Sequence, residues 1–370
     1  MAKGISTHGD VLISRLKDGT ELNDIWDEVK KVTDLWNNER QSITDLLSFK
    51  TTEINDVVPQ SFTTDKFEEA TEFGIPVAMR PPSDWLKLGY PFKDYGGRIA
   101  FTWKFLRDAT AEQVRAHVTR ALEADNSLTC NSIMNRIFNP TLRQNDFGNT
   151  VYGLYSADGT MTPPPYLGNV FDASHTHYLS TATTTLDSNH VEALLHHVEE
   201  HGYNRNGSTL LVLLNSNDFE VSRISAWRAG EEYRAGSPLP KWDFIPSTLM
   251  PAWLSNETVH GNVPDPQYNG LDVWGSYGNA LVIKSLYVPR NYVAVVATGG
   301  PNSDLNPVGF REHVLPEWQG LRHIPGQGQF PLQDSYFMRS FGVGVRHRGA
   351  AVVAQITAGA NYTPPVFDLP

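Results

Sequence analysis

The sequence predicts a protein of the α+β class, in which helices and strands occupy different stretches of the chain instead of alternating regularly. Three observations support this prediction. Segments 22–36 and 110–138 have helical periodicity, residues 98–106 alternate as a strand does, and several more strands gather toward the C-terminal end. We find no internal repeat and no low-complexity tail.

The composition is typical of a soluble globular protein. The chain has 370 residues, 40% of them hydrophobic, which is enough for one large or two moderate hydrophobic cores. A formal net charge of −11 argues against a surface that neutralises phosphates, although an acidic wall that merely encloses DNA agrees with it. We therefore expect no tight binding to DNA.

A single cysteine, Cys130, excludes an intrachain disulfide framework and a multi-cysteine zinc site, and it favours folding in a reducing cytoplasm. We expect a buried apolar thiol at this position. The chain has no run of 18 apolar residues and no apolar stretch typical of a secretion signal near its start. The sequence therefore predicts neither a membrane-spanning nor a secreted protein.

The first periodic segment predicts an amphipathic helix. Apolar side chains recur there at helical spacing between charged ones, at Leu22, Ile25, Trp26, Val29, Val32 and Trp36. A second apolar stretch follows at Ile43, Leu46 and Leu47. The helix either packs on the chain's own core or lies as an arm on a neighbouring subunit, and periodicity agrees with both alternatives.

Residues 56–97 are irregular and rich in proline, glycine and aromatic side chains. Such a stretch is too long for an ordinary connection, so it is either a functional loop or a mobile segment. Directly after it, RIAFTWKFL (98–106) alternates, which predicts a half-buried strand. The face that we expect to be buried carries Ile99, Phe101, Trp103 and Phe105.

A long helix is predicted over residues 110–138. Thr110 as N-cap and Gln113 three residues later form a capping-box pattern, and Asn139-Pro140 stops the helix. Its length would be roughly 40 Å at 1.5 Å per residue, unless the helix breaks near Asn126-Ser127.

The second half of the chain mixes helices and strands. A helix from about Asp187 to His201 ends at Gly202, and the continuous apolar run at 209–215 is typical of a central strand. Asn217 and Glu220 resemble the capping box of another helix. Further strands are predicted at 271–275, 279–288, 291–298, 336–345 and 349–357, and we expect the last two to return to the early half of the chain.

Two histidine motifs could carry metal chemistry. His197-Val198-Glu199-Glu200-His201 matches the H-x-x-E-H pattern of inverted zinc peptidases, in which Glu200 would serve as base. However, His201 precedes Gly202 at a fraying helix end, so helix capping and a solvated face explain the motif better. His175 and His177 share one face of a predicted strand, but no third carboxylate ligand is indicated. We therefore interpret them as surface histidines and expect no metal and no cofactor.

Other catalytic patterns are absent. The sequence has no nucleophile elbow, no phosphate-binding glycine-rich loop with its lysine, and no dinucleotide fingerprint. Instead, aromatic and arginine side chains, which are enriched at protein–protein hot spots, gather in segments without periodicity. They are Trp85, Tyr90, Phe92, Tyr95, Trp227, Trp242, Trp253, Trp318, Arg339, Arg346 and Arg348.

The order of elements resembles the major capsid proteins of tailed bacteriophages, which have the Hong Kong 97-type fold and share it with encapsulins. LLVLLNSNDFEVSRI resembles part of the axial domain, and FGVGVRHRGAAVVAQIT resembles the final peripheral-domain strands. Two passages, GPNSDLNPVGFREHVLPEWQG and FPLQDSYFMRSFGVGVRHRGAAVVAQI, resemble capsid proteins of actinobacterial phages.

The resemblance implies a division of the chain into capsid-fold segments. It implies an extended E-loop hairpin, a long spine helix, an antiparallel peripheral sheet and a mixed axial sheet with helices. The boundaries are 1–55 for the N-arm, 56–107 for the E-loop, 108–185 for the peripheral domain with the spine helix, 186–330 for the axial domain and 331–370 for C-terminal strands that return to the peripheral domain.

The resemblance also implies partners and a location. Copies of the chain would form hexamers and pentamers of an icosahedral shell around double-stranded DNA, without sequence-specific binding. Scaffold, portal or decoration proteins would be further partners, no membrane is involved, and assembly would take place in the cytoplasm of the host bacterium. Residues 82–96 should then contribute little to the monomer fold and much to assembly. The predicted intersubunit contacts are Trp85, Leu88, Tyr90, Phe92 and Tyr95.

Two alternatives remain open at this point. A zinc-dependent hydrolase would use His197, Glu200 and His201. Another phage structural protein, such as a tail component, would also assemble from copies of itself, but the assembly would have a different symmetry from that of a closed shell.

Overall fold

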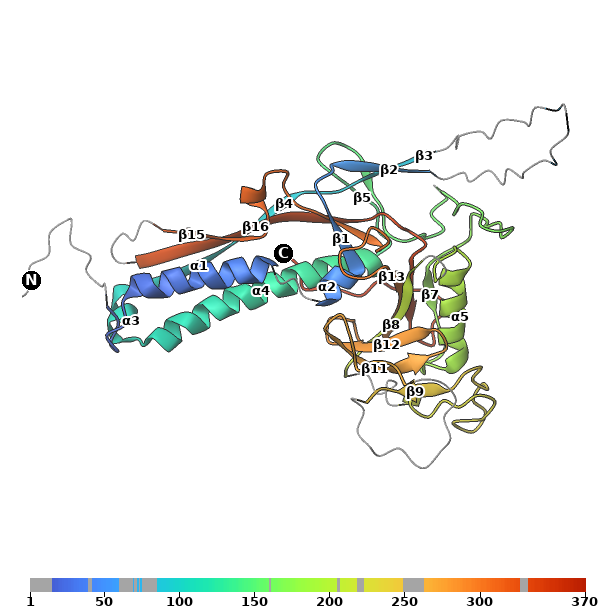
Figure 1. The fold of residues 1–370 in the computed structure, drawn as a ribbon. Coiled ribbons are helices and arrows are strands. Elements are labelled where there is room, and N and C mark those ends of the chain that lie inside the picture. The colour runs from blue at the N-terminus through green and yellow to red at the C-terminus, as the bar shows by residue number, and fades with distance from the viewer. Residues whose placement is uncertain are drawn as a thin grey trace, which may run out of the picture. The chain divides into compact units, whose positions relative to one another are not determined.

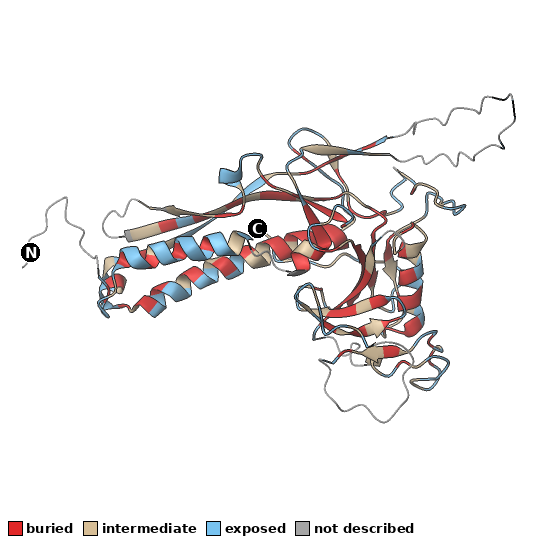
Figure 2. Ribbon diagram, viewed as in Figure 1, coloured by how far each residue is buried: buried red, intermediate tan, exposed pale blue. Residues whose placement is uncertain are grey.

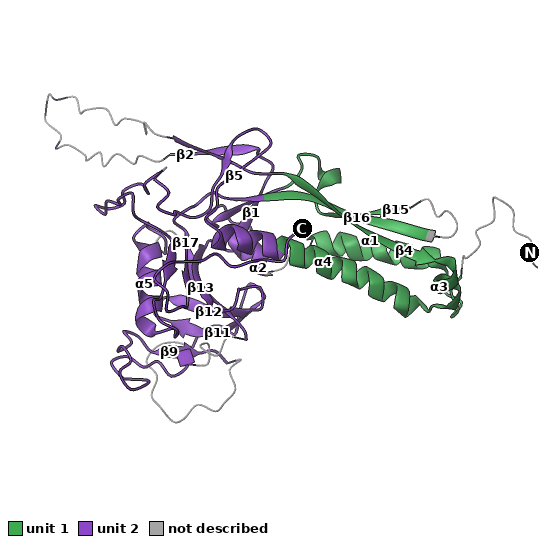
Figure 3. Cartoon of the chain, turned by 180° about the vertical axis from the view of Figure 1, so that it is seen from behind, with its two compact units in different colours: residues 1–41, 92–129, 312–342 green, residues 42–91, 130–311, 343–370 purple. Residues whose placement is uncertain are grey.

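A computed structural model describes most of the chain and divides it into two compact units (Figures 1 and 3). The first unit comprises residues 1–41, 92–129 and 312–342, and the second comprises 42–91, 130–311 and 343–370. The described residues are 15–38, 42–59, 69, 72, 74, 85–159, 161–204, 207–217, 223–248, 263–326 and 332–370.

Helix α1 (Leu22–Asn38) packs on the core of the first unit. Its buried side chains include Leu22, Ile25 and Val29, whereas Val32 is on the exposed face. The first of the two alternatives for this helix, packing on the chain's own core, is therefore confirmed. The core that it joins consists of Leu16, Leu22, Ile25, Val29, Phe101, Leu106, Ala111, Val114, Val118, Leu122, Leu321 and Phe337.

Helix α4 (Ala111–Phe138) is the predicted long helix, and its 28 residues run without a break through Asn126-Ser127. Half of the predicted capping box is present, because the side chain of Gln113 accepts the backbone N–H of Thr110 at 3.1 Å. The carboxylate of Asp18 accepts the N–H of Ala111 at 2.8 Å, which satisfies a second free donor of the first turn. The helix is roughly 42 Å long and contributes residues to both units.

An antiparallel sheet completes the first unit. Strand β16 (Leu332–Val345) pairs with β15 (Leu321–Pro325) on one side and β4 (Lys93–Thr102) on the other. The prediction that the strand near 336–345 returns to the early half of the chain is thus confirmed. Residues 312–326 also belong to this unit, because β15 pairs with β16.

The alternating strand ends earlier than predicted. Thr102 caps a short helix, α3 (Trp103–Asp108), by accepting the N–H of Phe105 on its hydroxyl at 3.1 Å. Trp103 therefore begins a helix and is half-buried, and the prediction of a buried strand position there is wrong. Phe101 keeps its place in the core, and the ring of Phe105 stacks on it at 5.5 Å between centroids.

The second unit is built on an eight-stranded mixed sheet with strand order β10-β11-β12-β8-β13-β17-β7 and β9 beside β11. The predicted central strand β8 is buried along its length, parallel to β12 and antiparallel to β13. The strands are β7 (Tyr178–Ser180), β8 (Thr209–Asn215), β9 (Phe244–Pro246), β10 (Gln267–Tyr268), β11 (Leu271–Tyr277), β12 (Ala280–Ser285), β13 (Tyr292–Thr298) and β17 (Ala351–Gln355).

Helix α5 (Ser188–Glu199) covers this sheet, as Figures 1 and 2 show. Its buried stripe of Val191, Leu194, Leu195 and Val198 packs with the inner faces of β8, β13 and β17 in one hydrophobic core. Strand β17 pairs with β13 and β7. The expectation that this last strand returns to the early half of the chain is confirmed by its pairing with β7, although its other neighbour, β13, belongs to the later half.

Several smaller elements complete the second unit. The segment with the second predicted capping box, Asn217 with Glu220, lies largely outside the described residues. No helix in the described part of the chain is long and apolar enough to cross a membrane. The remaining elements of the second unit are helix α2 (Ser42–Leu47) and three pairs of short strands. Strand β1 (Ser48–Thr51) is parallel to β14 (Val308–Arg311), whereas β2 (Asn55–Pro59) with β3 (Trp85–Gly89) and β5 (Arg143–Gln144) with β6 (Thr150–Val151) are antiparallel pairs. The 3₁₀ helix η1 (Pro316–Trp318) belongs to the first unit.

Candidate intersubunit contact site

Strands β2 and β3 form a two-stranded antiparallel ribbon with two different faces. Leu86 and Leu88 are buried on one face, whereas Trp85 and Lys87 are exposed on the other. Val57 is opposite Lys87 in the ladder, so it is the diagonal neighbour of Trp85 on the same outer face. Trp85 is 54% exposed and Val57 is 46% exposed. We call Val57, Trp85 and Lys87 the outer face of the ribbon.

The base of the ribbon is fixed to the second unit. The N–H of Tyr90 donates to the carbonyl of Ile54 at 3.0 Å, and the side-chain amide of Asn145 donates to the same carbonyl at 3.2 Å. An ion pair of 2.6 Å joins Asp56 on β2 to Arg346, which follows β16. Hydrogen bonds and a charge pair therefore hold the ribbon, and its outer face remains free of the core.

Leu88 and Tyr90 do not present a contact surface, because both are buried inside the second unit. The ring of Tyr90 lies over Gly309, where any side chain would collide with it, and close to Gly344. Burial raises the pKa of the Tyr90 hydroxyl, with a smaller contribution from the charge of Asp56. The prediction that residues 82–96 contribute little to the fold is therefore wrong for Leu88 and Tyr90.

Phe92 and Tyr95 are half-buried in the first unit. The ring of Phe92 lies 6.1 Å from that of His313, and the ring of Tyr95 lies 5.2 Å from that of Phe341. Of the five predicted contact residues, Trp85 is the one that the structure exposes by more than half.

Other aromatic and arginine side chains of the predicted hot-spot set have structural roles in the chain itself. Trp227, Arg339 and Arg348 are buried, and Trp253 lies outside the described residues. Trp318 is 44% exposed and the guanidinium of Arg322 lies 4.1 Å from its ring. Together with Val314 and Leu315, it forms an exposed apolar loop. The sequence has no periodic pattern there that would have predicted this loop as one surface.

The histidine motifs are arranged differently from a zinc peptidase site. Glu200 pairs with His196 at 2.9 Å, and the ring of His197 packs against His175 and His177 without joining the group of ring nitrogens that converge. That group consists of His175, His177 and His201, whose Nε2 atoms lie 3.0–3.2 Å from one another. Sequence analysis noted these histidines in two separate motifs and did not join them.

The pKa values of all three converging histidines lie below the ordinary value of 6.5. Burial and the neighbouring imidazoles hold the pKa of His177 well below its ordinary value, and they lower that of His201 to about 3. Burial also lowers the pKa of His175, against the attraction of Glu200 and Asp172. The interpretation of His175 and His177 as surface histidines is wrong for His177, which is completely buried.

Comparison with known proteins gives a strong match among the solved structures. No family model and no curated protein matches the sequence. A solved structure from Mycobacterium phage Patience has a chain that is 35% identical and superimposes with a TM-score of 0.72, with 98% of this chain and 97% of that chain covered.

Other solved structures match at low identity. A chain of the cyanophage A-1(L) capsid asymmetric unit is 10% identical, with a TM-score of 0.46 over 88% of this chain and 95% of that one. A chain of an encapsulin complex from Synechococcus elongatus is 14% identical, with a TM-score of 0.42 over 91% of this chain and 98% of that one.

The fold and the near-complete match at 35% identity define a structural protein of a phage particle. The chain belongs to the family of tailed-bacteriophage major capsid proteins with the Hong Kong 97-type fold, and its relative comes from a phage of an actinobacterium. It is a major capsid protein of the virion, a subunit of an icosahedral shell. This assignment replaces the alternatives of a zinc hydrolase and a tail component.

Proposed function

We propose that copies of this chain assemble as hexamers and pentamers into the shell, that the shell encloses double-stranded DNA, and that the outer face of the β2–β3 ribbon makes a principal contact between subunits. The observation that carries the contact is Trp85, a large aromatic side chain 54% exposed on a ribbon whose other face is anchored. Tryptophan is among the residues most enriched at hot spots, because it buries a large apolar area with few rotatable bonds.

The remaining features of the proposed function follow from charge and composition. The net charge of −11 supports a wall that encloses DNA without sequence-specific binding, since phosphate recognition requires a basic footprint. The lone cysteine, which is buried, supports assembly in the reducing cytoplasm of a host bacterium. Scaffold, portal or decoration proteins are the further partners that we propose, and we assign the chain no catalytic activity.

The contact is tested by replacing Trp85 with serine in the full-length chain. We expect the Trp85→Ser variant to fold with an unchanged melting temperature, because the side chain is largely outside the core. Loss of a hot spot weakens each contact by roughly 2 kcal/mol, so the yield of closed particles in sedimentation and electron microscopy should fall sharply.

The matched control is Trp242→Ser. Trp242 is 39% exposed in the second unit and packs edge-on at 5.6 Å against Tyr277 of β11, a strand that is in a different sheet from the ribbon. This variant should lose some thermal stability and still form shells. Complete particles at the wild-type yield from Trp85→Ser would rule out the proposed contact.

A further inference from the structure

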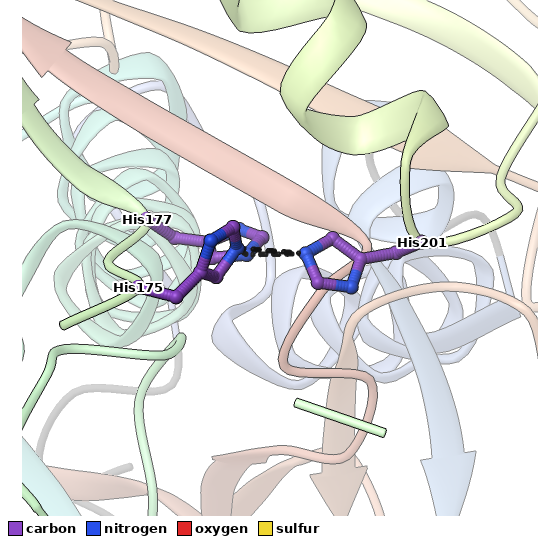
Figure 4. A group of neighbouring side chains, drawn as sticks. All are labelled: His175, His177 and His201. Atoms are coloured by element: carbon purple, nitrogen blue, oxygen red, sulfur yellow. Dashed lines mark hydrogen bonds between the residues drawn. The ribbon is translucent and has the colours of Figure 1, made fainter. Parts of the chain in front are cut away.

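Three imidazole nitrogens meet at one point in the second unit. His175 and His177 lie just before β7, and His201 lies just after α5 (Figure 4). The Nε2 atoms of His175 and His177 are 3.2 Å apart, and each lies 3.0 Å from Nε2 of His201. The three nitrogens thus form a nearly equilateral triangle.

Backbone contacts hold His177 in place. The backbone N–H of His177 donates to the carbonyl of Tyr155 at 2.8 Å, and the ring Nδ1–H donates to the carbonyl of Ala351 at 2.6 Å. A carbonyl bonded to the far nitrogen fixes the ring orientation and the tautomer, which is the usual support of a metal-binding histidine.

The other two rings are held by the surrounding side chains. The ring of Phe171 stacks on His201 at 4.3 Å, and His197 stacks on His175 at 4.4 Å with an interplanar angle of 2°. Helix α5 ends just before His201, where Gly202 has a φ of +88° that favours glycine. The triangle is therefore set by packing on several sides.

The close nitrogens cannot all be hydrogen-bonded to one another. Each neutral imidazole carries one N–H, and the proton of His177 is on Nδ1 because it faces a carbonyl that can only accept. His175 and His201 can then supply at most two protons to the three nitrogen pairs. At least one pair therefore brings together either two lone pairs or two N–H groups, and both arrangements are unfavourable. A cation that takes one lone pair from each of the three nitrogens removes this mismatch.

We propose that His175, His177 and His201 bind one divalent transition-metal ion, best matched by zinc. Zinc–nitrogen bonds of about 2.0–2.1 Å in a tetrahedron place the ligand nitrogens about 3.3 Å apart, close to the observed spacing. Imidazole suits zinc, copper and nickel, whereas calcium and magnesium take oxygen ligands. His175 and His201 are only partly buried, so water can supply the fourth ligand.

The ion has a structural role in this proposal. It links the segment before β7 to the end of α5, two parts of the second unit that are separated along the sequence. None of the three ligands is a carboxylate, and Glu200, the base that the H-x-x-E-H pattern would require, pairs with His196. By linking these two segments, the ion would stabilise the fold of the unit, independently of the subunit contact at Trp85.

The test measures metal content and melting temperature of the full-length chain. After dialysis against a chelator and addition of zinc, we expect about one zinc ion per chain and a higher melting temperature than without metal. Cobalt in place of zinc should give the visible absorption of a tetrahedral cobalt site. Wild-type protein that retains no zinc, and whose melting temperature zinc does not change, would overturn the proposal.

Variants locate the site. His175→Gln and His201→Gln should each lose stoichiometric zinc and the stabilisation by zinc. The control is His196→Gln on the same helix, since the side chain of His196 is 72% exposed and pairs with Glu200 outside the triangle. It should bind zinc like the wild type. Retention of zinc by both cluster variants, or its loss only in His196→Gln, would contradict this site.

Discussion

At the residue scale, the first unit depends on a buried group of charges between α4 and β16. The carboxylate of Asp125 accepts from Arg339 at 2.7 Å and from the indole N–H of Trp36 at 3.0 Å. Glu312 lies 3.9 Å from the same guanidinium. All three charged side chains are at most 10% exposed, so the arginine offsets two carboxylates that water does not reach.

Arg339→Met should therefore destabilise the chain strongly. It leaves Asp125 and Glu312 buried without their cation, which costs roughly 3–5 kcal/mol. Urea unfolding of the unassembled chain, followed by circular dichroism, measures the change. The matched control is Arg98→Met on β4, because the side chain of Arg98 is 48% exposed and its ion pair with Asp334 is worth at most about 1 kcal/mol. Equal effects of the two variants would show that the buried group is not a special source of stability.

A second residue-scale prediction concerns Gly309 on β14, which lies against the ring of Tyr90. A methyl group there collides with the buried ring, so Gly309→Ala should destabilise the chain by about 1–3 kcal/mol. Gly97→Ala on β4 is the control, because a Cβ atom at Gly97 meets nothing within 4 Å. Thermal unfolding compares the two, and a melting temperature of Gly309→Ala equal to that of the control would refute the packing of Tyr90.

At the scale of elements, α1 is joined to the sheet of the first unit through His323 on β15. Its ring stacks on Trp26 at 5.2 Å and lies 4.9 Å from Phe337, and neither ring nitrogen has a hydrogen-bond partner. Burial, assisted by the positive charge of Lys30, lowers the pKa of His323 below its ordinary value of 6.5.

The stability of the first unit should consequently depend on pH. A base whose pKa is lower in the folded state binds protons more readily when unfolded, so its contribution is complete above pH 6.5 and is lost as the pH falls below that value. His323→Phe keeps the stacking and removes the titration. We compare the melting temperature of this variant with that of the wild type at two pH values. The difference in favour of the variant should be larger at pH 5.5 than at pH 7.5. A difference independent of pH would contradict this role of His323.

Local patterns in the sequence predict the long elements well. Helix α4 agrees with prediction within a residue, since its cap, its apolar positions and its stop at Asn139-Pro140 are all local signals. Strand β8 follows from one continuous apolar run. The start of α3 at Trp103 was missed, because the local cap at Thr102 overrides an alternation that otherwise predicts a strand.

Contacts between distant parts of the chain could not be predicted in this way. Tyr90 is in a segment without periodicity, yet it is buried because it packs over Gly309 and Gly344. The histidine triangle likewise depends on the end of α5 meeting the segment before β7. The periodicity of a sequence contains no information on such contacts between distant segments. Leu88 and Tyr90, predicted to be contact residues, and His177, predicted to be a surface residue, are therefore buried in the structure.

At the scale of the whole molecule, the chain is a capsid subunit whose contacts must be made by surface that the monomer leaves exposed. Two apolar surfaces of this kind are the outer face of the ribbon, with Trp85 and Val57, and the exposed loop with Val314, Leu315 and Trp318. Exposed apolar patches on a soluble chain mark sites of association. We therefore expect neighbouring subunits to cover both of them.

Electron cryo-microscopy of the particles formed by the purified chain tests the central claim most directly. We expect closed icosahedral shells of hexamers and pentamers in which the side chain of Trp85 is buried against a neighbouring subunit. A purified chain that forms no closed particles, or shells in which Trp85 still faces solvent, would contradict the account.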